Sequence, residues 1–292
     1  MMLLPVEQTV DAGIAIRGWR SESTGRPLLC FLHGNGFCGP VYMPMLKELH
    51  KDFDLLMLDI PGHGVSDSIA VGWNQAAELV HQALIRQLDA LAPQIIYGVG
   101  HSLGAVLTLL SAHRHPDTFK SIVLLDPVLF PQRLLLLMRA AKMLKLTRLI
   151  HPLVRPTLKR RRQWQSANAA RDYLSGRKIY HGWTHESLQA FIDYALQSND
   201  SGGVELRCHP KTEAHYFATL PQGLWKALRG VTCNTTCIMG EDTYPFALDA
   251  VQSAAQVSAN ITKMTVPGGH CYMQQDPFNA ARCIKTSIES NS

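Results

Sequence analysis

The sequence predicts an α/β protein with a mostly parallel central sheet flanked by helices. Short apolar runs that end in turn residues alternate with helical patterns along most of the 292 residues, and this alternation is typical of strand–helix–strand units. The pattern stops after residue 126 for about one hundred residues and then resumes. We therefore expect one α/β core with a single insertion.

The part of the core before the insertion is expected to contain four buried strands and two helices. The strands are Leu28–Leu32, Phe53–Ile60, Ile95–Val99 and Ile122–Leu125. Each is a short apolar run that leads into a turn, which is the pattern of a strand buried on both faces. The predicted helices are Trp73–Leu91, which Pro93 closes, and Ser102–His113, which is apolar on several sides.

After the insertion the same alternation returns. It predicts a strand at Thr236–Met239, a helix around Leu248–Val257, a strand at Ile261–Val266 and a final helix from about Pro277. Residues 1–126 and 229–292 thus form the predicted core, and residues 127–228 form a mostly helical insertion. Its charge differs from that of the core, because it holds 16 Lys and Arg residues against 6 Asp and Glu residues.

The composition excludes several classes of protein. Apolar residues make up 46% of the chain and charged residues 17%, which argues against disorder. Seven cysteines without framework spacing predict reduced thiols and a cytoplasmic protein. The apolar N-terminal patch is cut by Pro5 and has no cleavage site, and no run approaches the ~18–20 apolar residues of a membrane span. We therefore expect a soluble protein without a signal peptide.

The run Gly100-His101-Ser102-Leu103-Gly104 stands between a predicted strand and a predicted helix. A serine nucleophile needs a tight strand-to-helix turn that lifts its hydroxyl from the edge of the sheet, and glycines two residues to either side let the backbone approach closely. A G-x-S-x-G run is common by chance, but its position between a strand and a helix makes it specific. Ser102 is therefore the predicted nucleophile.

Three further runs accompany this one in the chain. They are His33-Gly34-Asn35-Gly36, the turn from Asp59 to Asp67 with Pro61-Gly62-His63-Gly64, and Pro267-Gly268-Gly269-His270 followed by Asp276-Pro277. Together, and in this order, the four motifs resemble those of the α/β-hydrolase superfamily, and the resemblance covers nearly all of the chain outside residues 127–228. It implies the α/β-hydrolase fold, with those residues as a lid inserted after the sixth strand.

The resemblance also implies roles for individual residues. Ser102 would attack a carbonyl carbon and His270 would act as its general base. The backbone N–H groups of Asn35 and Leu103 would form the oxyanion hole. His33, His63 and His101 are expected to be structural, and no cofactor or metal is implied.

The acidic partner of His270 has two candidates. In the commonest arrangement of the family the acid follows the strand after the insertion in a G-x-x-D pattern, but here Thr243 occupies that slot and Asp242 comes one residue early. Such a shift matters because successive side chains of a strand point to opposite faces. Dehalogenase-like relatives carry the acid 24 residues beyond the nucleophile, where this chain has Asp126. Asp126 is the predicted acid, and Asp242 is the alternative.

The insertion contains a basic stretch, Pro131–His151, which mixes a run of leucines with Arg and Lys. Two readings are open: a lid helix with a solvated basic face, or an amphipathic lid that contacts anionic lipid or an anionic acyl carrier. Nucleic acid is not expected as a partner, because the cluster lacks interleaved aromatic residues. Aromatic side chains around Trp164, Tyr180, Trp183 and Phe217 could line an apolar pocket or form the small core of the lid.

The function that the resemblance implies is hydrolysis of a small-molecule carboxylic ester or thioester with an apolar acyl group. The same triad could instead serve an acyltransferase, a perhydrolase or a C–C hydrolase, and the sequence does not separate these activities. A non-catalytic binding protein of this fold would typically have lost the nucleophile, the base or the oxyanion loop. All three are present here.

Overall fold

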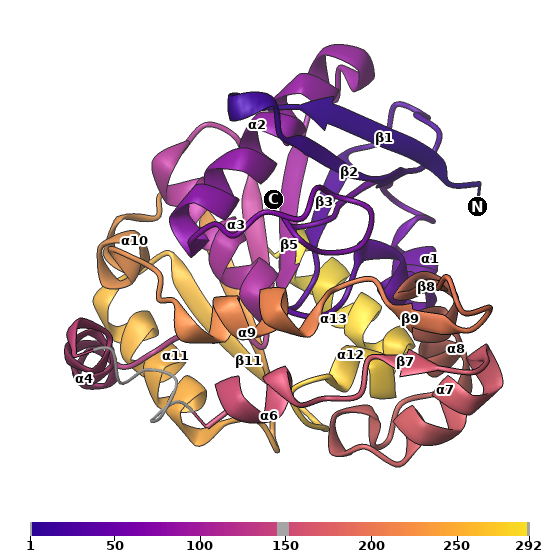
Figure 1. Ribbon diagram of the computed structural model, residues 1–292. Coiled ribbons are helices and arrows are strands. Elements are labelled where there is room, and N and C mark those ends of the chain that lie inside the picture. The colour runs from indigo at the N-terminus through magenta and orange to yellow at the C-terminus, as the bar shows by residue number, and fades with distance from the viewer. Residues whose placement is uncertain (1, 145–151, 291–292) are drawn as a thin grey trace.

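The computed structural model describes residues 2–144 and 152–290, and within them the central sheet has eight strands in the order β1-β2-β4-β3-β5-β6-β10-β11 (Figure 1). The strands are β1 (Leu4–Thr9), β2 (Ala15–Arg20), β3 (Leu28–Leu32), β4 (Asp54–Leu58), β5 (Ile96–His101), β6 (Ser121–Leu125), β10 (Asn234–Gly240) and β11 (Ile261–Val266). Strand β2 is antiparallel to both of its neighbours, and all other pairs are parallel. The predicted mostly parallel sheet is confirmed.

Helices cover both faces of this sheet (Figure 1). One layer consists of α2 (Trp73–Leu91), α3 (Leu103–Arg114), α10 (Leu224–Gly230) and α11 (Pro245–Val257), and the other of α1 (Met43–Leu49), α12 (Tyr272–Gln275) and α13 (Pro277–Glu289). The side chains of β3 alternate between the layers: Leu28 and Leu32 pack on the first, and Leu29 and Phe31 on the second. Because both of its faces are buried, β3 is a continuous apolar run in the sequence.

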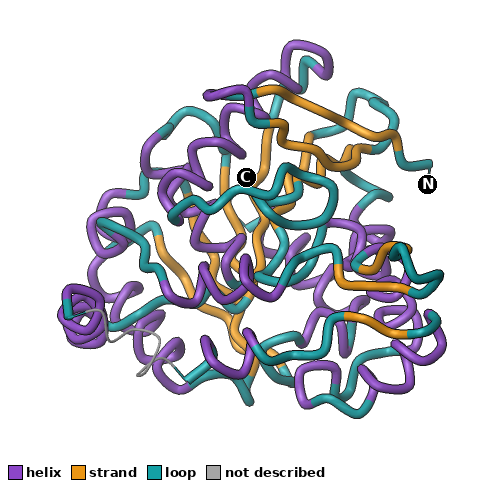
Figure 2. The backbone as a smooth tube through the Cα atoms, in the orientation of Figure 1, coloured by secondary structure: helices purple, strands orange, loops and turns teal. Residues whose placement is uncertain are grey.

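The segment between β6 and β10 crosses one end of the sheet (Figures 1 and 2). Before α10 it contains α4 (Gln132–Met143), α6 (Val154–Leu158), α7 (Ala167–Ser175), α8 (His185–Tyr194) and α9 (Pro210–Ala218). It also contains a three-stranded antiparallel sheet that the sequence did not predict, formed by β7 (Gln163–Trp164), β9 (Val204–Leu206) and β8 (Leu196–Ser198). The predicted basic stretch reaches beyond α4 into residues 145–151, which lie outside the described residues.

The carboxyl ends of the parallel strands bring distant residues to the edge that this segment crosses. Ser102 follows β5, Asp126 follows β6, and His270 lies in the loop after β11. Open α/β sheets carry their sites at this edge because all the parallel strands end there. None of the helices in the two described ranges combines the length and the apolarity that a bilayer crossing requires.

Candidate active site

Ser102 lies on the turn between β5 and α3 in a backbone conformation that residues other than glycine rarely adopt, with φ 53° and ψ −110°. The flanking glycines make this turn possible. A Cβ atom on Gly100 would lie 2.5 Å from the Gly104 carbonyl oxygen, and one on Gly104 would lie 2.2 Å from the Leu32 carbonyl oxygen. The glycine spacing of the motif is therefore required by close backbone contacts on both sides of Ser102.

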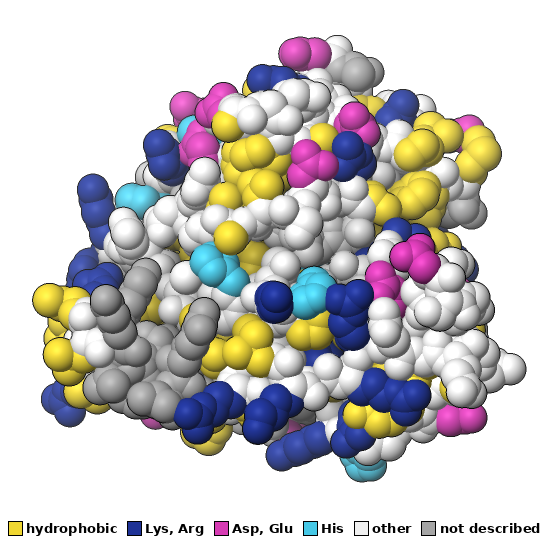
Figure 3. All heavy atoms as spheres, in the orientation of Figure 1, with side chains coloured by type: hydrophobic (Ala, Val, Ile, Leu, Met, Phe, Trp, Pro, Cys, Tyr) yellow, Lys and Arg dark blue, Asp and Glu magenta, His cyan; other side chains and the backbone are white. Residues whose placement is uncertain are grey.

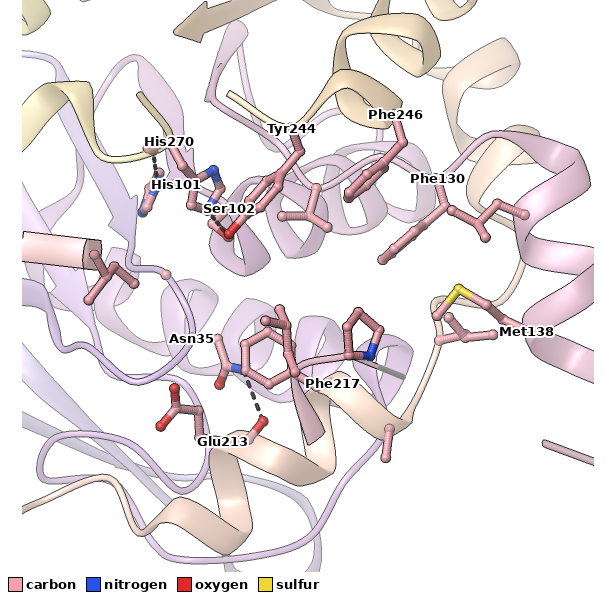
Figure 4. A pocket seen from close by; sticks show the side chains of 18 of the residues that line it. Asn35, His101, Ser102, Phe130, Met138, Glu213, Phe217, Tyr244, Phe246 and His270 are labelled. Atoms are coloured by element: carbon pink, nitrogen blue, oxygen red, sulfur yellow. Dashed lines mark hydrogen bonds between the residues drawn. The ribbon is translucent and has the colours of Figure 1, made fainter. Parts of the chain in front are cut away.

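His270 connects Ser102 to Asp126 through its two ring nitrogens, and Figure 4 shows the contact with Ser102. Its Nε2 lies 3.0 Å from Ser102 Oγ, and its Nδ1 lies 2.7 Å from an Asp126 carboxylate oxygen. The Asp126 side chain is fully buried and also accepts hydrogen bonds from the Gly240 N–H, at 2.8 Å, and from the Thr243 hydroxyl. Such an arrangement can move the hydroxyl proton of the serine to the imidazole while the carboxylate stabilises the resulting cation.

Asp242, the alternative acid, is not brought to His270. Its side chain is exposed, and its backbone N–H donates to the Gly268 carbonyl at 2.9 Å. Within residues 2–144 and 152–290 no hydrogen bond joins its carboxylate to the His270 ring. Thr243 instead directs its hydroxyl at Asp126, so the residue in the usual acid slot helps to hold the carboxylate on the neighbouring strand.

Asn35 and Leu103, the predicted oxyanion donors, border a recess of about 30 Å³ together with Ser102. Leu103 is the first residue of α3, where a backbone N–H has no partner inside the helix. The side chain of Asn35 is fixed on two sides, by His63 Nε2 at 3.1 Å from its Oδ1 and by the Glu213 carbonyl, which accepts from its Nδ2 at 3.0 Å. In the described part of the chain, neither backbone N–H has a hydrogen-bond partner.

A buried chain of hydrogen bonds connects the loop before Asn35 to the backbone of His270. The Gly34 N–H donates to the Tyr42 hydroxyl at 3.0 Å, that hydroxyl lies 2.6 Å from His101 Nδ1, and His101 Nε2 lies 2.9 Å from the His270 carbonyl oxygen. Burial holds the pKa of His101 well below, and that of Tyr42 well above, their usual values. Both groups are therefore neutral and act as fixed connectors. The sequence did not single out Tyr42, because it lies outside every motif.

The other two motif histidines hold loops in place. His33 Nδ1 lies 2.8 Å from the Gly34 carbonyl oxygen, and its Nε2 accepts from the Ile60 N–H at 3.0 Å. Burial lowers the pKa of His33 well below its usual value and that of His63 to about 4. No group of three or more His, Cys, Asp or Glu side chains in the described ranges could hold a metal ion.

A cavity of about 630 Å³ opens over Ser102, and its wall is predominantly apolar (Figure 4). Phe130, Tyr244 and Phe246 line one side and Phe217 faces them from the other. The segment between β6 and β10 contributes further apolar side chains, namely Val128, Leu134, Leu137, Met138, Pro152, Leu153, Ile179, Ala218 and Leu220. Of the four aromatic residues singled out in the sequence, Phe217 lines this cavity. Trp164 and Tyr180 are instead buried in the apolar cluster that includes α1, α12 and α13, and Trp183 packs against that cluster.

The sequence of the chain is similar to those of known hydrolases. The model of the alpha/beta hydrolase family matches residues 31–281. The chain is 25% identical to the 2-(acetamidomethylene)succinate hydrolase of Mesorhizobium japonicum over 98% of this chain and 96% of that protein. It is 32% identical to a pimeloyl–acyl-carrier-protein methyl ester esterase of Vibrio vulnificus over 36% of this chain and 38% of that protein.

A solved structure shows the same fold. The crystal structure of E-2-(acetamidomethylene)succinate hydrolase superposes with a TM-score of 0.79 at 23% identity, over 99% of this chain and 100% of that chain. At this identity the likeness concerns the fold alone.

Proposed function

The chain belongs to the alpha/beta hydrolase family, and we propose that it hydrolyses a carboxylic ester or thioester through an acyl-enzyme on Ser102. The observation that carries the proposal is the continuous chain of hydrogen bonds from Ser102 through His270 to Asp126, at the floor of an apolar cavity. A nucleophile, a base that it touches and a group that orients the base are the parts that acyl transfer requires.

In the proposed mechanism His270 accepts the proton of Ser102 as the oxygen attacks the carbonyl carbon. The N–H groups of Leu103 and Asn35 donate to the oxyanion that forms, and Asp126 stabilises the imidazolium. His270 then protonates the leaving alcohol or thiol. Water then attacks the acyl carbon and gives a proton to the same imidazole. The bond from that carbon to Ser102 Oγ breaks as His270 returns the proton to the serine, and the acid leaves.

The lining of the cavity supports an apolar acyl group as the substrate portion that binds there. Among the described lining residues there is no Lys or Arg, and Glu213 supplies a carboxylate. The succinate in the name of the Mesorhizobium relative is a dicarboxylate, and carboxylates are bound best by charged hydrogen-bond donors. The lining of this cavity therefore favours an apolar acyl group over a dicarboxylate.

A fluorophosphonate probe tests the proposal directly, because it forms a covalent bond only with an activated serine. Peptide mapping should place the label on Ser102 in the native enzyme, with none after heat denaturation. Absence of labelling in the folded protein would favour a binding role. Release of p-nitrophenol from short esters with and without an acceptor alcohol would then separate hydrolysis from acyl transfer.

We further propose that residues 127–228 act as a lid and that α4 contacts anionic lipid. Leu136, Leu137 and Met143 on α4 are 63%, 68% and 85% exposed, beside the exposed cations Arg133 and Arg139. Figure 3 shows hydrophobic and basic side chains together at the left edge, where Figure 1 has α4. An exposed apolar face with a basic rim suits a membrane surface of negative charge.

Vesicles of defined composition check the lipid contact. We expect vesicles with 30% phosphatidylserine to retain the protein at low salt and pure phosphatidylcholine vesicles to retain little of it. An Arg133→Gln/Arg139→Gln variant should show a much smaller difference in retention between the two, since each cation near an anionic surface contributes about 1 kcal/mol to binding. Equal retention on both vesicles would contradict the proposal. Retention on neither, with binding of an acyl-CoA, would assign the basic face to an anionic acyl carrier.

The cysteines support the cytoplasmic location predicted from the sequence. All seven are free thiols, and five of them are buried: Cys30, Cys38, Cys208, Cys237 and Cys271. Free cysteines of this number are typical of a reducing compartment.

A further inference from the structure

We propose that the ion pair between Arg160 and Glu213 positions the oxyanion loop, residues 33–36, from the lid side of the cavity. The inference rests on the proposed function, in which the Asn35 N–H stabilises the oxyanion. Neither Arg160 nor Glu213 belongs to a sequence motif. They are positioning residues, because the group that meets the substrate is the backbone N–H of Asn35.

The two side chains form a short and well-shielded pair. Arg160, which follows α6, places Nη1 2.6 Å from Glu213 Oε2, and the side chains are 24% and 11% exposed. The Tyr180 hydroxyl lies 3.4 Å from the other terminal nitrogen of Arg160. Burial raises the pKa of Glu213, and the Arg160 guanidinium opposes that shift.

Glu213 contacts the oxyanion loop in two ways. Its carbonyl oxygen accepts the hydrogen bond from Asn35 Nδ2, at 3.0 Å. Its carboxyl group lies directly against Gly36, because a Cβ atom there would be 3.2 Å from the carboxyl carbon and from Oε1. Gly36 has φ 83°, a conformation that favours glycine. The loop is thus held by His63 on the core side and by Glu213 on the lid side, where Figure 4 shows the hydrogen bond to Asn35.

The rest of α9 is attached to the core without the ion pair. The Tyr216 hydroxyl donates to the Pro61 carbonyl at 3.2 Å, and the Trp73 indole N–H donates to the Tyr216 carbonyl at 3.2 Å. His215 Nε2 lies 3.1 Å from the Val71 carbonyl oxygen. Loss of the ion pair should therefore leave the helix in place and release the Glu213 carboxyl group alone.

Arg160 also neutralises a charge that would oppose catalysis. Glu213 lines the same cavity as Ser102, and negative charge develops on the substrate oxygen during attack. An unpaired carboxylate in this low-dielectric wall would raise the energy of that oxyanion. Both the positioning and the neutralisation act on the transition state more than on bound substrate, so they should alter kcat and leave KM nearly unchanged.

The chain offers a matched control pair. Arg162 and Glu205 form an ion pair of the same length, 2.6 Å, in the same segment, but neither residue lines the described cavity. The comparison therefore uses Arg160→Met against Arg162→Met, and Glu213→Gln against Glu205→Gln. The double variant Arg160→Met/Glu213→Gln removes both charges and leaves no unpaired ion.

With p-nitrophenyl butyrate as substrate, Arg160→Met should lower kcat about tenfold or more, since loss of an oxyanion donor costs about 10²–10³, with KM within twofold. The double variant and Arg160→Lys should each keep a higher kcat than Arg160→Met. The kcat of Arg162→Met should stay within twofold of wild type. The Ki of a trifluoromethyl ketone, whose hemiketal oxygen occupies the oxyanion hole, should rise by the factor that kcat/KM loses.

Three results would overturn the inference: unchanged kcat in Arg160→Met, equal losses in the 160 and 162 variants, or a rise in KM alone. If Arg160→Met does not fold, the double variant decides: it leaves no unpaired ion, and it should still have a lower kcat than wild type with KM within twofold. A wild type that no fluorophosphonate labels would refute the proposed function together with this inference. A labelled wild type with an unaffected Arg160→Met variant would refute the inference alone.

Discussion

Replacing Ser102 with alanine should lower kcat for ester hydrolysis by about 10⁶-fold, the loss that follows when a serine hydrolase loses its nucleophile. The reason is that Ser102 Oγ is the group that His270 Nε2 contacts, at 3.0 Å. Alanine removes this oxygen and adds nothing to the turn between β5 and α3. Initial rates with a p-nitrophenyl ester, measured at enzyme concentrations high enough to detect the residual rate, check the prediction.

The melting temperature of Ser102→Ala serves as its control. It should stay close to that of wild type, because alanine carries the same φ of 53° at no greater cost. A variant that folds and keeps more than one hundredth of the wild-type rate would contradict the proposed acyl-enzyme and require a nucleophile elsewhere in the cavity.

Replacing Asp126 with asparagine should lower kcat by about 10⁴-fold, whereas Asp242→Asn should stay within a few fold of wild type. Asparagine at 126 keeps the shape of the side chain but can present an amide N–H to His270 Nδ1, which favours the ring tautomer that cannot accept the serine proton. Asp242 is exposed and has no such contact. Steady-state kinetics of the two variants side by side give the comparison.

The two variants also test the structure against the commonest arrangement of the family. A collapse of turnover in Asp242→Asn, with Asp126→Asn near wild type, would show that the acid follows β10 after all. Thr243→Val offers an intermediate case, because it removes the hydroxyl that donates to Asp126 but leaves the Gly240 N–H in place. Its loss should be smaller than that of Asp126→Asn.

Much of the α/β core could be predicted from hydrophobic pattern alone. Leu28–Leu32, Trp73–Leu91 and Ile261–Val266 have the predicted bounds, because each is an apolar or amphipathic run enclosed by turn residues. The antiparallel hairpin of β1 and β2 is not among the predicted strands. Pro5 lies inside β1, and proline argues against a strand unless the strand is at the edge of a sheet, as β1 is.

Some residues of the candidate site could also be predicted from the sequence, and others could not. Ser102 and His270 stand in motifs whose local backbone needs are visible in the sequence, so they could be identified without coordinates. The choice between Asp126 and Asp242 depends on where the ends of β6 and β10 lie relative to His270. The sequence does not give these positions, and it shows only that Asp242 comes one residue before the usual acid slot. Arg160, Glu213 and Tyr42 come from segments that only folding brings to the oxyanion loop, so no local pattern marks them.

The left-handed backbone at Ser102 has a consequence for anyone who improves this protein by laboratory evolution. A side chain at that φ costs about 1–3 kcal/mol, and glycine would avoid most of this cost. A screen that rewards heat resistance alone would therefore favour glycine at the position of the proposed nucleophile. Each round of selection needs a turnover assay as well as a melting curve, because higher thermal stability and the proposed activity favour different residues at position 102.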